Sequence, residues 1–399
     1  MMKRITEDMA RQLADAWVVY DYGSTNPVFR EIIGTYHMTR KCFVIVGKNG
    51  DVRMICHSID AGVIRQKGTV LPVRIVTYNR WKELINALKC ELSGCSTVLM
   101  EVSENGLLPR VSYADYGTVR LVESFGCTVK TSADLFQMMV SKMAPVSYEW
   151  HVKAAEAVTN IKAEAFEYLF RKIAESGEVQ EFDVQQFIMK RFAEEGMVTD
   201  SPPIVAIATN AANPHYEPSA NDTAFIRKGD VILMDLWAKY DNPDAVFGDI
   251  TWMGYAGEDI PKGYQHIFNV LKEASDAAIN FISRNIGKRK VCGYEVDDVC
   301  REVIEKYGYG EYFTHRTGHS LSVGDSDHGT GVNIDNYETH DVREIIDGVG
   351  FSIEPGIYIE GEIGVREECN VCIWNGQVVV TTPRQERIIK PSDYGVCIL

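Results

Sequence analysis

Residues 231–254, VILMDLWAKYDNPDAVFGDITWMG, constrain the fold more than any other stretch because they place carboxylates inside apolar surroundings. Asp235 interrupts the apolar run 231–238, which predicts a strand buried on both faces. A buried carboxylate without a partner costs several kcal/mol. A loop follows, and a second strand carries Asp249. We expect an antiparallel hairpin centred on Asn242, with Asp235 directly opposite Asp249. Like charges at that position repel, so a cation is expected between them.

Residues 351–373, FSIEPGIYIEGEIGVREECNVCI, repeat the arrangement more than a hundred residues later. A hairpin folded about Gly361 sets Glu354 opposite Glu368. For either hairpin alone, a turn with solvated carboxylates or a shared proton explains the pattern equally well. Two facing acidic pairs in one domain, with a histidine cluster between them, favour a cation site.

The histidine cluster is HRTGHSLSVGDSDH, with His315, His319 and His328. Three histidines within one short stretch are also compatible with a polar loop. Spacing of four residues suits a zinc-protease helix, but Thr317 and Gly318 argue for an irregular segment. Four carboxylates and one neutral imidazole bring four negative charges, which two divalent cations would cancel.

These residues resemble the pita-bread metallopeptidases, a family that includes methionine aminopeptidase, aminopeptidase P, prolidase and the metal-free creatinase. In that family Asp, Asp, His, Glu and Glu, in this order, hold two metal ions. The resemblance places them at Asp235 (LMDLW), Asp249 (GDIT), His319 (HRTGH), Glu354 (SIEPG) and Glu368 (VREE). All five are present, which argues against a creatinase-like member.

The resemblance also implies catalytic roles. Glu354 is expected to carry the proton to the leaving amine, and this choice over Glu368 rests on the resemblance alone. His215 in NPHYEP, His315 and His328 are not needed as ligands and are expected to donate hydrogen bonds to the substrate carbonyl or oxyanion. Each of the three is equally compatible with a purely structural role.

Two further residues share strand faces with the expected ligands. Thr251 and Arg366 lie two residues from Asp249 and Glu368, and we interpret them as orienting those carboxylates or meeting a substrate carboxylate. A charge-balancing ion pair explains Arg366 equally well. Trp252 stands where the family more often has arginine, so a different pocket wall is expected. The stretch HGTGVN after the third histidine lacks the basic residue with which prolidases tend to bind a dipeptide carboxylate.

Two domains are expected from a chain of 399 residues. Residues 1–145 alternate strand and helix patterns, which predicts a small α/β domain. In the resembling family such a domain serves dimerisation and shapes the site entrance. Residues 146–399 begin with a long helical pattern after Pro145 and are predicted to form an α+β pita-bread domain, with helices covering a curved antiparallel sheet.

Composition narrows the partners and the compartment. A net charge of −15 disfavours nucleic acid and anionic membrane. No apolar run is long enough for a membrane span, and the N-terminus lacks a signal-peptide core. The ten cysteines are scattered and are expected to be free thiols. We therefore expect a soluble cytoplasmic protein, and the resemblance implies a homodimer.

The predicted function is hydrolysis of the bond between an N-terminal residue and proline, as in Xaa-Pro aminopeptidases and Xaa-Pro dipeptidases. Two divalent ions per chain are expected, with Mn²⁺ favoured by oxygen-rich ligation and Co²⁺, Zn²⁺ or Fe²⁺ also compatible. The substrate would be a short peptide. Two alternatives stay open: a peptidase or amidohydrolase of the same fold without a proline requirement, and a peptide-binding scaffold without catalysis.

Overall fold

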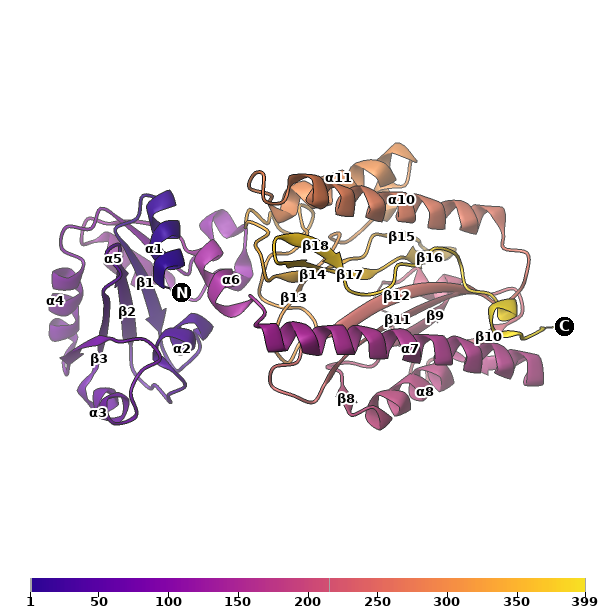
Figure 1. Cartoon of the computed structure of the whole chain (residues 1–399), viewed down its shortest axis with the longest axis horizontal. Helices are drawn as coiled ribbons and strands as arrows, with labels where there is room; N and C mark the ends of the chain where they lie inside the picture. Colours follow the sequence, from indigo (N-terminus) through magenta and orange to yellow (C-terminus); the bar gives the residue numbers. More distant parts are fainter. Residues whose placement is uncertain (1, 215, 399) are drawn as a thin grey trace. The chain divides into compact units, whose positions relative to one another are not determined.

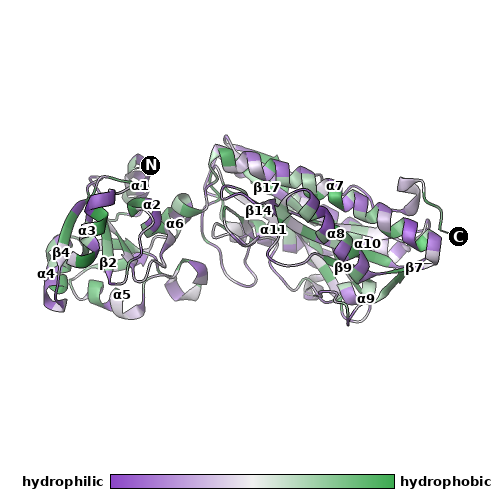
Figure 2. Cartoon of the chain, turned by 90° about the horizontal axis from the view of Figure 1, so that it is seen from below, coloured by the Kyte–Doolittle hydropathy of each residue, from purple (hydrophilic) through white to green (hydrophobic). Residues whose placement is uncertain are grey.

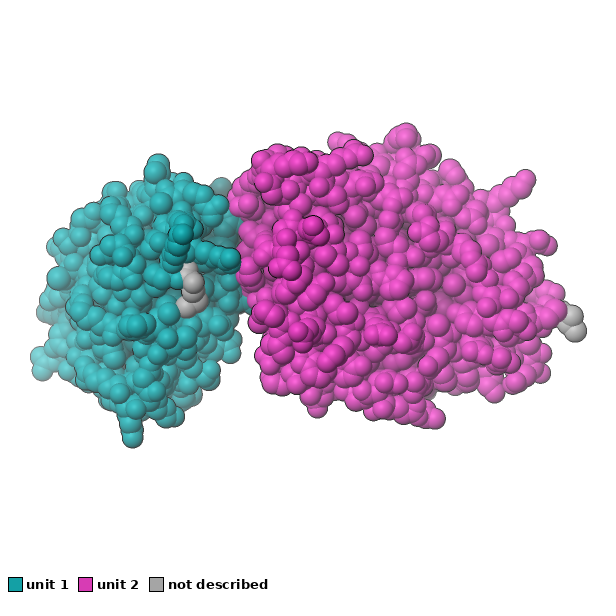
Figure 3. Space-filling view, viewed as in Figure 1, with its two compact units in different colours: residues 1–140 teal, residues 141–399 magenta. Residues whose placement is uncertain are grey.

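A computed structural model describes residues 2–214 and 216–398. The chain divides into two compact units, residues 1–140 and 141–399, which are coloured separately in Figure 3. The segment that precedes the long helix at Pro145 belongs to the second unit because its contacts lie there. Met143 N donates to Gly348 O (2.8 Å), and the hydroxyl of Ser141 lies 3.0 Å from that of Thr330.

Unit 1 is an α/β domain built on one six-stranded sheet with the order β4-β3-β2-β1-β5-β6 (Figure 1). The central hairpin of β2 and β3 is antiparallel, whereas β3 pairs with β4, and β5 with β1 and β6, in parallel. Its strands are β1 (Ala16–Asp21), β2 (Cys42–Gly47), β3 (Val52–His57), β4 (Arg74–Tyr78), β5 (Thr97–Met100) and β6 (Thr128–Thr131). Its helices are α1 (Met2–Arg11), α2 (Pro27–Ile33), α3 (Ser58–Lys67), α4 (Trp81–Glu91), η1 (Glu104–Gly106), η2 (Pro109–Val111), α5 (Tyr116–Glu123) and α6 (Ala133–Val140).

Unit 2 combines helices with strands that form antiparallel ladders with one another, and one isolated parallel bridge joins Gly254 to Ile389. Its strands are β7 (Glu178–Gln180), β8 (Met197–Val198), β9 (Ile204–Ile207), β10 (Phe225–Arg227), β11 (Val231–Tyr240), β12 (Gly248–Tyr255), β13 (Ser320–Leu321), β14 (Gly350–Ile353), β15 (Gly356–Ile359), β16 (Ile363–Arg366), β17 (Cys369–Trp374) and β18 (Gln377–Val380). Its helices are α7 (Pro145–Ser176), α8 (Glu181–Glu194), α9 (Ala208–Ala211), α10 (Lys262–Asn285), α11 (Gly293–Lys306), η3 (Gly310–Tyr312) and η4 (Pro391–Tyr394).

Strand β11 is buried on both faces, as its apolar run predicted. Because side chains alternate along a strand, Ile232, Met234 and Leu236 pack with α7 and α8 in one core. Leu233 on the other face packs into a second core with α10 and α11. Figure 1 shows these helix pairs on opposite sides of the strands, and Figure 2 shows apolar colour concentrated inside. Asp235 is buried on the same face of β11 as Leu233, the face that α10 and α11 cover.

No helix among residues 2–214 and 216–398 is both long and apolar enough to cross a membrane.

His151 in α7 ties the helix to two other segments of unit 2. Its Nδ1 donates to the carbonyl of Phe247 (2.7 Å), and its Nε2 accepts from the hydroxyl of Thr381 (2.7 Å). The imidazole is fully buried, and burial lowers its pKa to about 4. The folded state therefore holds this ring neutral.

We expect this neutral ring to make unit 2 lose stability as the pH falls. Between about pH 6.5 and pH 4 the unfolded chain binds one proton more at His151 than the folded chain does, so the free energy of unfolding decreases over that window. Urea unfolding measures the free energy of unfolding at pH 7 and at pH 4.5. Its decrease between these two pH values should be on the order of 2 kcal/mol larger in the unmutated chain than in His151→Gln. Equal losses in both proteins would refute this assignment.

Candidate metal centre

A cavity of about 520 Å³ in unit 2 contains all five side chains predicted as metal ligands. Its charged and histidine lining comprises Glu217, Asp235, Asp249, His315, Arg316, His319, Asp327, His328, Glu338, Glu354, Arg366 and Glu368. Seven of these are carboxylates and two are arginines, so the lining carries an excess of negative charge. A cavity of this volume suits a small ligand.

The first hairpin brings its two aspartates to one face, but not in the predicted register. Asp235 pairs with Thr251, and Asp249 pairs with Trp237, so the two carboxylates lie diagonally rather than directly opposite. The tight turn forms where Ala245 N donates to the carbonyl of Asn242 (3.0 Å), so its centre falls one residue later than expected. A shift of the centre by one residue moves every pairing by two, which keeps both aspartates on the same face.

The second hairpin has the predicted register. Ile353 pairs with Cys369, and Gly356 pairs with Arg366, so Glu354 and Glu368 lie at matching positions between the two ladders. The ladder between the two strands is interrupted there because the backbone N–H groups of both glutamates bond to other segments. Glu354 N donates to the carbonyl of Thr317 (2.8 Å), and Glu368 N donates to that of Thr251 (3.2 Å).

Side-chain contacts join the two hairpins. The hydroxyl of Thr251 donates to Glu368 Oε2 (2.8 Å), and Asp249 N donates to Asn370 Oδ1 (2.9 Å). These bonds link residues more than a hundred positions apart and bring the two acidic pairs into one cavity. Thr251 therefore orients a glutamate, which is one of the two roles predicted for it.

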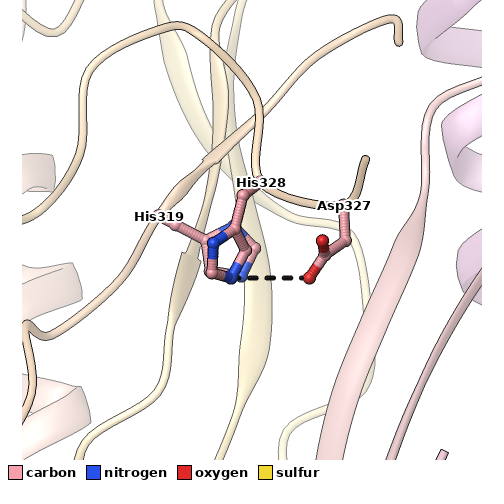
Figure 4. Close-up of side chains that lie close together, drawn as sticks. All are labelled: His319, Asp327 and His328. Atoms are coloured by element: carbon pink, nitrogen blue, oxygen red, sulfur yellow. Dashed lines mark ion pairs between the residues drawn. The ribbon is translucent and has the colours of Figure 1, made fainter. Parts of the chain in front are cut away.

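His319 lies between the acidic pairs. Its Nε2 is 3.2 Å from Asp249 Oδ2 and 3.5 Å from Glu354 Oε1. Ligand atoms of Asp249, His319 and Glu368 all lie within 4.8 Å of one another, which is close enough for one ion to reach all three. His319 also belongs to a second such group with Asp327 and His328, shown in Figure 4.

The electrostatics of the cavity fit a cation. Burial raises the pKa of Asp249, and the nearby Asp235 carboxylate raises it further. Burial and then Asp249 do the same for the pKa of Glu368. Asp235 Oδ1 and Glu368 Oε1 are buried and accept no hydrogen bond from the described residues. Buried carboxylates of this kind are stabilised by a metal ion, and oxygen with one imidazole nitrogen is a suitable donor set for divalent ions.

Arg366 lies inside the site, and each nitrogen of its guanidinium contacts a protein group. It forms an ion pair with Asp235, donates to the hydroxyl of Thr251 (3.0 Å) and donates to that of Tyr358 (2.8 Å). This arrangement matches the charge-balancing alternative and also orients Asp235. Gly356 makes room for the tyrosine, since a Cβ atom there would lie 2.3 Å from the Tyr358 hydroxyl oxygen.

The other predicted histidines differ in their surroundings. His315 is bonded through Nδ1 to the carbonyl of Arg316 (2.7 Å) and through Nε2 to the Tyr358 hydroxyl (2.8 Å). Burial lowers the pKa of His315 to about 4. His328 lines the cavity more openly, with Nδ1 3.2 Å from Arg316 Nη2. His215 lies outside the described residues.

Trp252 does not form part of the pocket wall, so that expectation was wrong. It alternates with Asp249 and Thr251 along β12 and therefore faces α7, where it packs in the core. Lys162 Nζ lies 3.3 Å from the centre of its ring, a cation–π contact.

Sequence reasoning missed Tyr358 and Arg316. Tyr358 carries a signal that strand alternation offers, because it lies four residues after Glu354 and so faces the same way. Arg316 lies in an irregular segment beside His315, where no periodicity predicts the direction of a side chain.

Comparisons with known proteins agree with this site. A sequence profile of metallopeptidase family M24 matches residues 153–375, more than half of the chain. The Xaa-Pro dipeptidase of Lactobacillus helveticus is 33% identical over 242 residues, which cover 57% of this chain and 56% of that protein. The chain thus spans little more than half the length of this relative.

Solved structures extend the likeness to both units. The prolidase from Pyrococcus horikoshii OT3 matches with a TM-score of 0.60 at 22% identity, covering 97% of this chain and 99% of that one. Dipeptidase PepE from Mycobacterium ulcerans matches with a TM-score of 0.67 at 18% identity, covering 98% and 96%. These matches confirm the predicted α+β pita-bread fold with its N-terminal α/β domain. The profile match confirms the predicted family, and the chain belongs to metallopeptidase family M24.

Proposed function

We propose that this chain is an exopeptidase that hydrolyses the bond between an N-terminal residue and proline with two divalent ions. The ions would be held by Asp235, Asp249, His319, Glu354 and Glu368. The observation that carries the proposal is the convergence of two acidic hairpins and His319 in one cavity, where two buried carboxylate oxygens accept no hydrogen bond from the part of the chain that the structure describes. A scaffold without catalysis would not require such a costly arrangement.

The ions, when bound, would polarise the scissile carbonyl and lower the pKa of a water molecule toward neutrality. Glu354 would accept the proton of the attacking water and pass it to the leaving amine. Its position supports this role, because Oε1 lies 3.5 Å from His319 Nε2 and accepts from the hydroxyl of Ser352 (2.8 Å). Ser352 would fix Oε1 of Glu354, and Oε2 of the same carboxylate would take part in the reaction.

His328 would donate a hydrogen bond to the substrate carbonyl as negative charge develops there. His215 is proposed to act in the same way. His315 would orient Tyr358 and Arg366, since its two nitrogens are bonded within the protein. Arg366 and Thr251 would hold Asp235 and Glu368 in place.

The proline requirement draws its support from relatives. The proteins from Lactobacillus helveticus and Pyrococcus horikoshii bear the names Xaa-Pro dipeptidase and prolidase. A cavity of about 520 Å³ is compatible with a short peptide. We therefore expect Xaa-Pro dipeptides to be cleaved, with longer Xaa-Pro peptides as the competing substrate class.

Mass spectrometry of three peptide sets tests this proposal. Xaa-Pro dipeptides, Xaa-Pro-Yaa tripeptides and Xaa-Ala controls are incubated with the chain and Mn²⁺. Cleavage of the first set, with intact alanine controls, is the expected result. Release of the N-terminal residue from tripeptides alone would make the chain an aminopeptidase, and cleavage of the alanine controls would contradict the proline requirement.

The proposal includes manganese as the native metal, a homodimer and a cytoplasmic location. Oxygen-rich ligation supports manganese. Exposed apolar side chains on unit 1, namely Ile59 (61% exposed), Val63 (46%) and Trp81 (59%), support an association surface there. The ten cysteines are scattered along the chain without the dense spacing of a disulfide scaffold, which supports a reducing compartment.

A further inference from the structure

The side chain of Arg316 contacts His328 in the cavity. Its Nη2 lies 3.2 Å from His328 Nδ1. A guanidinium group is always protonated and has no acceptor, so it is the donor in this contact. Nδ1 of His328 must then carry the lone pair. A neutral imidazole has one hydrogen, which leaves that hydrogen on Nε2.

Glu338 holds the arginine in this orientation. Its Oε2 accepts from Arg316 Nη1 (3.0 Å), and its Oε1 accepts from the backbone N–H of the same residue (3.2 Å). The arginine side chain is only 17% exposed. One nitrogen of the planar guanidinium is therefore held by a carboxylate that also holds the backbone of Arg316, and Nη2 is left directed at His328.

Arg316 also sets the tautomer of the preceding residue, His315, and this tautomer is the opposite of that of His328. His315 Nδ1 lies 2.7 Å from the carbonyl oxygen of Arg316, and a carbonyl only accepts, so the hydrogen of His315 is on Nδ1. Its Nε2 then accepts from the hydroxyl of Tyr358. The backbone and side chain of one residue thus set two histidines in opposite states.

We propose that Arg316 is a positioning residue that fixes His328 as the Nε2–H tautomer, a hydrogen-bond donor that cannot bind metal. This decides between the two groups that share His319. In Figure 4 the ring of His328 lies over that of His319 and faces Asp327. With Nδ1 accepting from Arg316 and Nε2 protonated, His328 offers no lone pair to an ion, so the group of Asp249, His319 and Glu368 binds it. Only the substrate-donor role of His328 rests on the proposed function.

Nitrogen-15 NMR of the histidine-labelled, zinc-loaded chain tests the tautomer without any activity measurement. Zinc is diamagnetic, and His328→Gln assigns the resonances. We expect a lone-pair shift at Nδ1 of His328 and a protonated shift at Nε2, with the two reversed or mixed in Arg316→Met. A protonated Nδ1 in the unmutated chain would overturn the proposal. If Arg316→Met fails to fold, the spectrum of the unmutated chain still decides.

A double-mutant cycle tests whether Arg316 acts through His328. Arg316→Met should lower kcat about 100-fold, as loss of a transition-state donor does, with KM changed less than about threefold. In the His328→Gln background the same substitution should have no further effect. Arg316→Lys keeps a donor and should recover part of kcat. Equal losses in both backgrounds would refute the proposal, whereas an unmutated chain inactive on every Xaa-Pro peptide would refute the proposed function and leave the NMR result standing.

Discussion

His319→Ala and Glu368→Ala are each expected to abolish turnover and, at the same time, to lower the metal content of the chain. His319 Nε2 lies 3.2 Å from Asp249 Oδ2, and Glu368 has a buried oxygen that accepts no hydrogen bond from the described residues. Removal of either side chain takes a donor from the ion and leaves neighbouring carboxylates facing one another. We expect kcat to fall by at least about 10³-fold, with metal content measured by mass spectrometry of the purified protein.

Two surface variants control for general effects of the substitution. His266→Ala removes an exposed histidine from α10, and Glu362→Ala removes an exposed glutamate from the turn of the second hairpin. Both should keep full metal content and kcat. Full activity in His319→Ala or Glu368→Ala would remove that residue from the assigned ligands.

Glu181→Ala is expected to destabilise unit 2 and to disturb the wall of the cavity. Glu181 is completely buried at the start of α8 and accepts four kinds of bond: from Ile207 N (2.7 Å), Asn210 Nδ2 (2.9 Å), the Tyr216 hydroxyl (2.6 Å) and Ala224 N (2.8 Å). A donor left buried without a partner costs about 1–3 kcal/mol. The expected loss in free energy of unfolding is on the order of 4 kcal/mol, because relaxation recovers part of the sum.

The same substitution should raise KM about tenfold, since the segment that Glu181 holds contributes Pro214, Tyr216 and Glu217 to the cavity. Urea unfolding and steady-state kinetics measure the two effects. Asp183→Ala is the matched control, because Asp183 is an exposed acid in the same first turn of α8. Unfolding of Glu181→Ala at the same urea concentration as Asp183→Ala would show that these bonds contribute little.

Strand alternation is the part of the site that the sequence could predict. Asp235 and Asp249 reached the same face although the turn centre was placed one residue too early, because an error of one in the centre preserves the side of every residue. For Glu354 and Glu368 the turn at Gly361 also fixed the register. Gly361 has a φ of +74°, a conformation that glycine adopts without strain, so the glycine indicated the position of the turn.

The sequence by itself determined the family, the fold class and the set of acidic residues and histidines, because periodicity and turn residues act between close neighbours in the chain. Only the tertiary structure decided which groups meet. The contacts of Arg366 with Asp235 and of Thr251 with Glu368 join residues more than a hundred positions apart, and Arg316 reaches His328 from an irregular segment. No local pattern encodes such contacts, since each depends on how whole hairpins pack and on the direction in which a single side chain is held.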